Sequence, residues 1–229
     1  MCNRFGIIKD IRVIAAAFGV DGEPGRSHPR PDIRPTDRIP VIAIGRSRRR
    51  QLIDARWGLV PHFAREETPG GQTTNARSET IAEKPTWKPS FLAQGGRGGR
   101  CLIPFDVFYE WSGEKGSKVM HTITAPSNRP IAFAGLWAAW PKVPTNLPKP
   151  YLSAAIVTTP ANGQMAGIHD RMPAILDEDS FALWLGEAPA TDSELMGLLI
   201  PWSGQLQIDP DPPILTAAGK TQWDSPKAV

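Results

Sequence analysis

The chain has 229 residues, of which 41% are hydrophobic and 21% charged, a composition that suits one globular domain with a substantial core. Its net charge of +3 permits a polyanionic partner without requiring one. It contains no apolar run of about 18 residues and no signal-peptide pattern, so we expect a cytoplasmic protein without a membrane segment. Two cysteines, Cys2 and Cys101, are too few for a disulfide framework or a four-ligand zinc site, and we expect no metal and no cofactor.

The order of apolar and polar residues predicts strands interleaved with short helices. Apolar residues recur at helical spacing between residues 9 and 18, and a proline-rich loop follows over residues 21–40. Further strands are expected at 41–44, 52–57, 101–111, 119–124, 131–140 and 151–160. Further helices are expected from a cap at Thr74 or Asn75 to Pro85, within 88–99, and at 177–186 and 191–199. This mixture indicates an α+β fold with a strongly curved, partly closed, barrel-like sheet of mixed or antiparallel strands and peripheral short helices.

The first four residues, Met-Cys-Asn-Arg, place a cysteine directly after the initiator methionine. Removal of Met1 would leave Cys2 with an α-amine and a thiol on adjacent carbons. An aldehyde can condense with the amine to a Schiff base, and the sulfur can then close a five-membered thiazolidine ring. An α-amine has an ordinary pKa of about 7.7–8.0, so part of it is nucleophilic at physiological pH. Taken alone, position 2 is better explained as an arbitrary residue, and the rest of the chain must support this chemistry.

Two titratable side chains in unusual settings are candidates for acid–base chemistry. Glu110 lies in an apolar and aromatic run, where desolvation raises the pKa of a carboxyl group toward neutrality. His169 lies in a polar turn, a common place for catalytic residues, and an imidazole titrates near neutral pH. Each residue has a structural alternative: a salt bridge for Glu110 and an ordinary turn histidine for His169.

Polar residues elsewhere could contact a ligand or simply face solvent. Asn75 and Arg77 are two positions apart, so an extended backbone would point both into one cleft; taken alone, they are a helix cap and a surface charge. The arginine-rich run at 46–50 is interpreted as a solvated hairpin turn, with contact to backbone phosphates as the alternative.

Five motifs, in chain order, resemble the SRAP family, the SOS-response-associated peptidase proteins that shield abasic sites in single-stranded DNA. They are MCNR (1–4), RWGLVP (56–61), NARSET (75–80), PFDVFYEW (104–111) and IHDRMP (168–173). The resemblance implies an SRAP domain over residues 2–200, with residues 201–229 as a C-terminal extension packed on it or frayed from it. It also implies the same curved, partly closed sheet, with the DNA groove at its open edge.

The resemblance also implies a role for each matching residue. After loss of Met1, Cys2 would link covalently to the ring-opened aldehyde of an abasic deoxyribose as a thiazolidine. Asn75 would hold the linkage and the N-terminus, Glu110 would shuttle protons during Schiff-base formation or reversal, and His169 would help to open the sugar. The predicted DNA contacts are phosphates for Arg4, Arg77 and Thr158, and a stacked base for Trp111.

Three departures from the family pattern affect the expected DNA contacts. Asn3 stands where the family commonly has glycine, which adds bulk beside the nucleophile. Asp32 replaces the amide of a Tyr-Asn-x-x-Pro motif and adds a negative charge to that loop. His62 and Phe63 replace a tryptophan-containing wedge, so that stacking at a duplex junction would be weaker.

Three functions remain open at this point. The first is covalent capture of abasic sites in single-stranded DNA, with associated lyase chemistry because a Schiff base acidifies the adjacent carbon. The second is a thiol peptidase in which Cys2 attacks a peptide carbonyl and His169 acts as base, with removal of Met1 as its minimal form. The third is a non-covalent single-stranded-DNA module that does not need Cys2. In each case we expect a monomer in the cytoplasm, associated with the nucleoid when bound to DNA.

Overall fold

The computed structural model describes residues 2–21, 29–67, 72–92, 97–114, 116–144, 147 and 149–210. In chain order the strands are β1 (Phe5–Ile7), β2 (Arg30–Ile33), β3 (Arg38–Ile44), β4 (Arg50–Trp57), β5 (Asn75–Arg77), β6 (Gly98–Pro104), β7 (Val107–Ser112), β8 (Val119–Thr124), β9 (Ile131–Trp140), β10 (Tyr151–Pro160), β11 (Arg171–Pro173), β12 (Ile175–Asp177) and β13 (Gln207–Pro210). The helices are α1 (Ile11–Ala17), the 3₁₀ turn η1 (Ser78–Thr80), α2 (Lys88–Leu92), α3 (Glu178–Leu185) and α4 (Asp192–Gly197). None of the helices in these ranges is long and apolar enough to cross a membrane.

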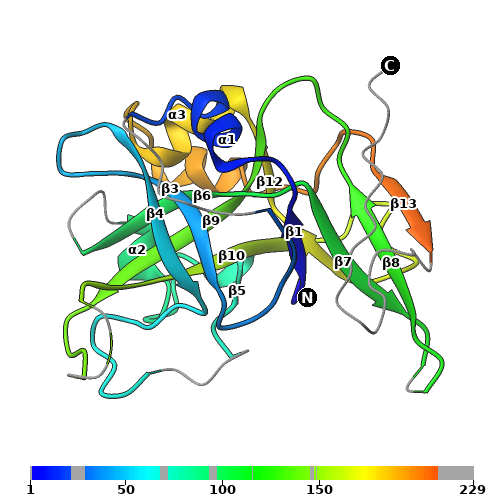
Figure 1. Cartoon of the computed structure of the whole chain (residues 1–229), viewed down its shortest axis with the longest axis horizontal. Coiled ribbons are helices and arrows are strands. Elements are labelled where there is room, and N and C mark those ends of the chain that lie inside the picture. Colours follow the sequence, from blue (N-terminus) through cyan, green and yellow to red (C-terminus); the bar gives the residue numbers. More distant parts are fainter. Residues whose placement is uncertain are drawn as a thin grey trace.

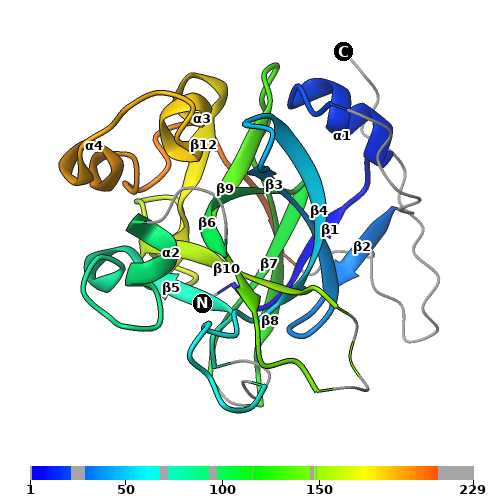
Figure 2. The same cartoon turned by 90° about the vertical axis from the view of Figure 1, so that its left-hand side faces the viewer.

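The larger of two sheets closes into a barrel because β10 pairs with both β4 and β9. The closed ring consists of β10, β4, β3, β6 and β9. The short strands β5 and β11 also pair with β10, and β12 also pairs with β9. The pairings of β10 with β4 and β5 are parallel, whereas the other pairings are antiparallel. Figure 2 shows the ring with α2, α3 and α4 on one side and α1 on the other.

A smaller antiparallel sheet, in the order β13-β8-β7-β1-β2, stands beside the barrel (Figure 1). Phe5 of β1 ties the two sheets together: its ring lies 5.0 Å from that of Trp57 and 5.9 Å from that of Phe133, both edge to face. Edge-to-face aromatic pairs favour one fixed geometry as well as burying area. Because Phe5 is held in this way, the residues just before it are fixed at the junction of the two sheets.

The barrel wall is packed too tightly at one point to accept any side chain. A Cβ at Gly135 of β9 would lie 2.8 Å from Cys101 Sγ and 2.9 Å from side-chain carbons of Ile103. Cys101 itself is fully buried, as its apolar sequence context predicts, and burial raises the pKa of its thiol. This thiol therefore belongs to the core and not to the candidate site.

Local capping explains where the helices begin and end. Asp10 caps α1 and Asp177 caps α3, each carboxylate accepting from a backbone N–H of the first turn. Gly186 ends α3 in the left-handed conformation, at φ 78°. Thr191 and Glu194 form a reciprocal capping box at the start of α4.

The predicted fold class is confirmed: a mostly β molecule with a closed barrel and few short helices. The expected helix from Thr74 or Asn75 to Pro85 is wrong, because residues 75–77 form β5 and pair with β10 before a single 3₁₀ turn. The expected strand at 101–111 is two strands in different sheets, separated at Phe105 and Asp106. Residues 207–210 form β13 on β8, and the part of the C-terminal extension beyond 210 lies outside the described residues.

Candidate functional site

The N-terminal residues lie beside the middle of the smaller sheet. Phe5 of β1 pairs with Phe108 of β7, and the N–H of Tyr109 donates to the carbonyl oxygen of Arg4 at 3.0 Å. This pairing continues toward Cys2 on one strand and toward Glu110 on the other. Cys2 is completely buried, and its Sγ lies 3.7 Å from the carbonyl oxygen of Arg4 as a weak donor.

Asn75 holds the backbone of Cys2 from the opposite side. Its Nδ2 donates to the carbonyl oxygen of Cys2 at 2.9 Å and also lies 3.1 Å from Thr74 Oγ1 and 3.4 Å from Asn3 Oδ1. Its Oδ1 is buried and has no hydrogen-bond partner among the described residues. The parallel pairing of β5 with β10, Asn75 opposite Ile156, aims the side chain at the N-terminus. Asn75 thus fixes the backbone of Cys2, and its Oδ1 is an acceptor that no described residue uses.

Glu110 supplies a carboxyl group with an unusual acidity. It is 3% exposed, and burial raises its pKa from an ordinary 4.5 to about 7, with a further increase from the charge of Asp170. The positive charge of the amino terminus opposes this increase. Burial is the main cause of the raised pKa of the Cys2 thiol, and the negative charge of Glu110 is the second cause. At neutral pH Glu110 can therefore exchange a proton in either direction, whereas the Cys2 thiol keeps its own.

His169 lies in the turn before β11, with its side chain one quarter exposed. Its Nδ1 accepts the N–H of Arg171 at 2.9 Å, which requires an unprotonated Nδ1 and leaves the proton on Nε2. The same Nδ1 lies 2.7 Å from an oxygen of Asp170, which favours the opposite tautomer or the charged ring. Burial lowers the pKa of His169, followed by the charge of the amino terminus, so the neutral ring dominates at pH 7. A neutral ring with two competing Nδ1 contacts can shift its proton between its nitrogens.

Arg171 and Glu79 join the His169 turn to the Asn75 strand. Arg171 is 8% exposed and forms two hydrogen bonds to the carboxylate of Glu79, one of them at 2.9 Å. It also donates to the carbonyl oxygen of Thr158 at 2.7 Å. The hydrogen bond from Arg171 lowers the pKa of Glu79, so the pair is charged at neutral pH. The sequence analysis did not identify this pair, although its opposite charges lie in the NARSET and IHDRMP motifs.

The four predicted DNA-contact residues differ in accessibility. Arg77 is exposed, and its positive charge contributes to the lowered pKa of Glu79. Arg4 is engaged by Asp32 and lies over the rings of Tyr109 and Trp111, which is itself partly exposed. Thr158 is completely buried and turns its hydroxyl toward the carbonyl oxygen of Ala76 at 3.5 Å.

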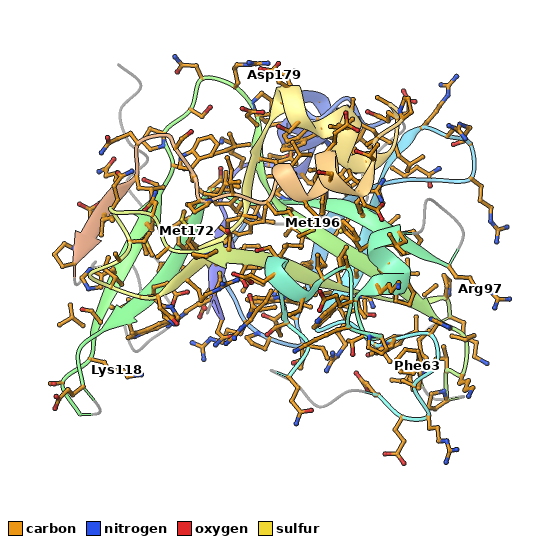
Figure 3. All side chains as sticks on the ribbon, turned by 180° about the vertical axis from the view of Figure 1, so that it is seen from behind. Phe63, Arg97, Lys118, Met172, Asp179 and Met196 are labelled. Atoms are coloured by element: carbon orange, nitrogen blue, oxygen red, sulfur yellow. The ribbon has the colours of Figure 1, made fainter. Side chains whose placement is uncertain are left out.

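The loop before β5 carries two more residues that the sequence analysis singled out. The rings of His62 and Phe63 meet edge to face at 5.4 Å. Phe63 is 48% exposed and points outward at the edge of the molecule in Figure 3. No group of three or more histidine, cysteine, aspartate or glutamate side chains in the described ranges could hold a metal ion.

The barrel with an adjoining smaller sheet defines the fold class, and Cys2 is buried where the two sheets meet. The sequence profile described as "SOS response associated peptidase (SRAP)" matches residues 1–210. The chain therefore belongs to the SRAP family, as its motifs predict.

Named relatives agree with this assignment, and solved structures share the fold. The chain is 35% identical over 207 residues to the abasic site processing protein YoqW of Bacillus subtilis, with 88% of each chain covered. It is 33% identical over 177 residues to the abasic site processing protein HMCES of Gallus gallus, covering 68% of this chain and 51% of that one. A crystal structure of a Bacteroides thetaiotaomicron protein has the same fold, with a TM-score of 0.75, 23% identity and 91% of each chain covered. A Bordetella bronchiseptica protein matches with a TM-score of 0.71, 22% identity, and 91% and 99% coverage.

Proposed function

We propose that this protein handles abasic sites in DNA by capturing them covalently in single strands, through Cys2 after removal of Met1. The observation that carries the proposal is the hydrogen bond from Asn75 to the carbonyl oxygen of Cys2, which fixes the chain start beside the buried carboxyl group of Glu110. The names of the relatives, abasic site processing proteins, support the same substrate. We infer that the protein acts as a monomer in the cytoplasm, on the nucleoid when bound to DNA.

The first step is opening of the sugar. An abasic deoxyribose exists mainly as a cyclic hemiacetal, so its anomeric hydroxyl must lose a proton while the ring oxygen gains one. His169 suits this step because its ring is neutral at pH 7, so it can take a proton from the anomeric hydroxyl and return it to the ring oxygen. The product is the free aldehyde at C1′.

The second step joins the amine of Cys2 to the aldehyde. The neutral amine attacks C1′ to give a carbinolamine, and loss of one water gives the Schiff base. An acid must protonate the departing hydroxyl, and Glu110, with a pKa of about 7, is half protonated at neutral pH. The same carboxyl group then accepts the proton that the amine nitrogen gives up.

The third step closes the ring. The thiol of Cys2 adds to the imine carbon, its proton is transferred to the imine nitrogen, and a thiazolidine results. Because burial raises the pKa of this thiol, sulfur attack requires a proton acceptor close by, and Glu110 is the carboxylate that acts on it most strongly. Asn75 keeps the backbone of Cys2 still throughout.

Lyase activity is part of the same proposal. A protonated Schiff base acidifies C2′, so loss of a proton there would eliminate the 3′ phosphate and cut the strand. Thiazolidine closure removes the imine and therefore suppresses this cleavage. Strand cleavage is expected to rise when the sulfur is absent but the amine remains.

The test uses the two cysteines of the chain as a matched pair. An oligonucleotide with one abasic site, incubated with the wild type, should give a heat-stable band of lower mobility on a denaturing gel. Cys2→Ser should abolish that band and leave a borohydride-trappable Schiff base with increased strand cleavage. Cys101→Ser, which changes the buried thiol of the barrel, should crosslink as the wild type does. A stable crosslink with Cys2→Ser would contradict the proposal and favour another nucleophile. No crosslink with the wild type would contradict it as well and favour a non-covalent module.

A further inference from the structure

The guanidinium of Arg4 is already bound to a carboxylate of its own chain. Nε of Arg4 lies 2.6 Å from Oδ1 of Asp32, and Nη2 lies 2.9 Å from Oδ2. This is the bidentate arrangement in which arginine binds either a carboxylate or a phosphate. The face of Arg4 that would recognise a DNA phosphate is therefore occupied.

The other faces of Arg4 are packed as well. Its guanidinium carbon lies 5.7 Å from the ring centre of Tyr109 and 5.9 Å from that of Trp111. Nη1 lies 3.9 Å from the sulfur of Met120, and the side chain is only 15% exposed. Arg4 cannot form a bidentate contact with an incoming phosphate unless it first separates from Asp32.

Asp32 is held firmly in this position. Strand β2 pairs with β1, Ile33 opposite Phe5, and Tyr109 donates its hydroxyl to the carbonyl oxygen of Pro31 at 2.9 Å. Burial acts to raise the pKa of Asp32, but hydrogen bonds from Arg4 and Arg34 outweigh it and lower the pKa. Asp32 is thus a fixed, ionised carboxylate at neutral pH.

We propose that Asp32 determines the affinity of the protein for DNA, because a DNA phosphate reaches Arg4 only by displacing the Asp32 carboxylate. The inference rests on the proposed function and on the contact of Arg4 with a DNA phosphate that the family resemblance implies. Arg77 is the contrasting cation: it is exposed, and no bidentate carboxylate contact to it is found among the described residues, although its charge acts on Glu79. Asp32 weakens binding to undamaged strands, so that retention of DNA depends on the covalent step at Cys2.

The experiment measures non-covalent binding of an intact single-stranded oligonucleotide, without an abasic site, by fluorescence anisotropy. Asp32→Asn keeps the side-chain size and removes the competing charge. We expect it to bind roughly tenfold tighter at low salt. For single strands, each added phosphate contact steepens the slope of log K against log[salt] by about 0.7. The gain in affinity of Asp32→Asn over the wild type should therefore shrink roughly threefold between about 50 and 200 mM salt.

Asp179→Asn is the matched control for the change in net charge. Asp179 forms the same kind of bidentate pair, with Arg129 at 2.6 and 2.8 Å, but lies in α3 (Figure 3). It should change oligonucleotide binding by less than about twofold, because the Asp179 side chain is 73% exposed and solvent-exposed charges are screened. Adding Arg4→Ala to Asp32→Asn should remove the gain, which assigns the new contact to Arg4.

Three results would overturn the inference: Asp32→Asn binding no tighter than the wild type, Asp179→Asn giving an equal gain, or a gain that survives Arg4→Ala. Asp32→Ser serves as a second variant if Asp32→Asn unfolds at the assay temperature, and thermal unfolding identifies that case. Binding of an intact strand needs no reaction at Cys2. Failure to crosslink abasic DNA would contradict the proposed function, but the binding assay would still test the role of Asp32.

Discussion

At the scale of single residues, folding shifts the pKa of Glu110 into the range that the proposed chemistry needs. Burial raises the pKa of its carboxyl group from an ordinary 4.5 to about 7 in the folded protein. Between pH 4.5 and pH 7 the folded protein therefore binds a proton that the unfolded chain does not. Stability therefore falls as pH rises from about 4.5 to 7, by at most about 3 kcal/mol. Glu110→Gln cannot ionise, so its stability relative to the wild type should be higher at pH 8 than at pH 5.

Urea unfolding at the two pH values measures this difference. The comparison uses the change in relative stability, so a constant packing effect of the glutamine cancels. An equal stability difference between variant and wild type at pH 5 and pH 8 would show that Glu110 is ionised normally. It would also remove the basis for its proton transfer at neutral pH.

Asn75 should matter to capture more than to stability. Asn75→Asp preserves size but cannot donate to the carbonyl oxygen of Cys2, so the chain start loses its fixed position. We expect the rate of crosslinking to fall at least about tenfold, as for other losses of alignment, and stability to fall by about 1 kcal/mol. Single-turnover crosslinking and urea unfolding measure the two effects.

Asn3→Gly is the companion variant for Asn75. Asn3 is exposed and accepts only the longest of the three Asn75 contacts, at 3.4 Å. Its replacement by the residue common in the family should change the crosslinking rate by less than about twofold. If Asn75→Asp reacted as fast as Asn3→Gly, the hydrogen bond to Cys2 would have no part in capture.

At the scale of elements, the ion pair of Arg171 with Glu79 holds the His169 turn to β5 and η1. Arg171→Met would leave the carbonyl oxygen of the buried Thr158 and the partly exposed carboxylate of Glu79 without this donor. We expect a loss of about 2 kcal/mol in the free energy of unfolding. Arg129→Met, which removes an exposed pair with α3, should cost less than about 1 kcal/mol. Equal losses in urea unfolding would mean that Arg171 is only a surface charge.

Element prediction from the sequence succeeded where periodicity was regular. The strands 131–140 and 151–160 were predicted with their observed bounds because both are nearly continuous apolar runs. The helix expected from Asn75 to Pro85 failed because Thr74 and Asn75 look like a cap, whereas pairing with β10 makes Asn75–Arg77 a strand. That long-range pairing leaves no signal within so short a segment.

In the candidate site, too, features set by neighbouring residues could be predicted, whereas contacts between residues far apart in the chain could not. The burial of Glu110 could be predicted because its neighbours are apolar, and the raised pKa follows from that burial. The pairing of Arg4 with Asp32 could not, because it depends on β2 lying against β1 across 28 positions of the chain. Sequence motifs identified the candidate reacting groups, whereas the contacts that restrain these groups could be found only in the fold.

On the scale of the whole molecule, the two sheets meet at the chain start. The barrel contributes Asn75 through β5, and the smaller sheet contributes Glu110 through β7. Phe5 packs between them against Trp57 and Phe133. Cys2 is positioned by the tertiary structure on both sides, which is why a residue at the very beginning of a chain can be completely buried.

Intact-mass spectrometry of the purified protein, before and after incubation with an oligonucleotide carrying one abasic site, tests this account most directly. The account predicts a protein without Met1 that gains the mass of the oligonucleotide less one water, with the adduct on Cys2 in the peptide map. A protein that has lost Met1 completely and still gains no mass would contradict covalent capture. An adduct located on any residue other than Cys2 would contradict the assignment of the nucleophile.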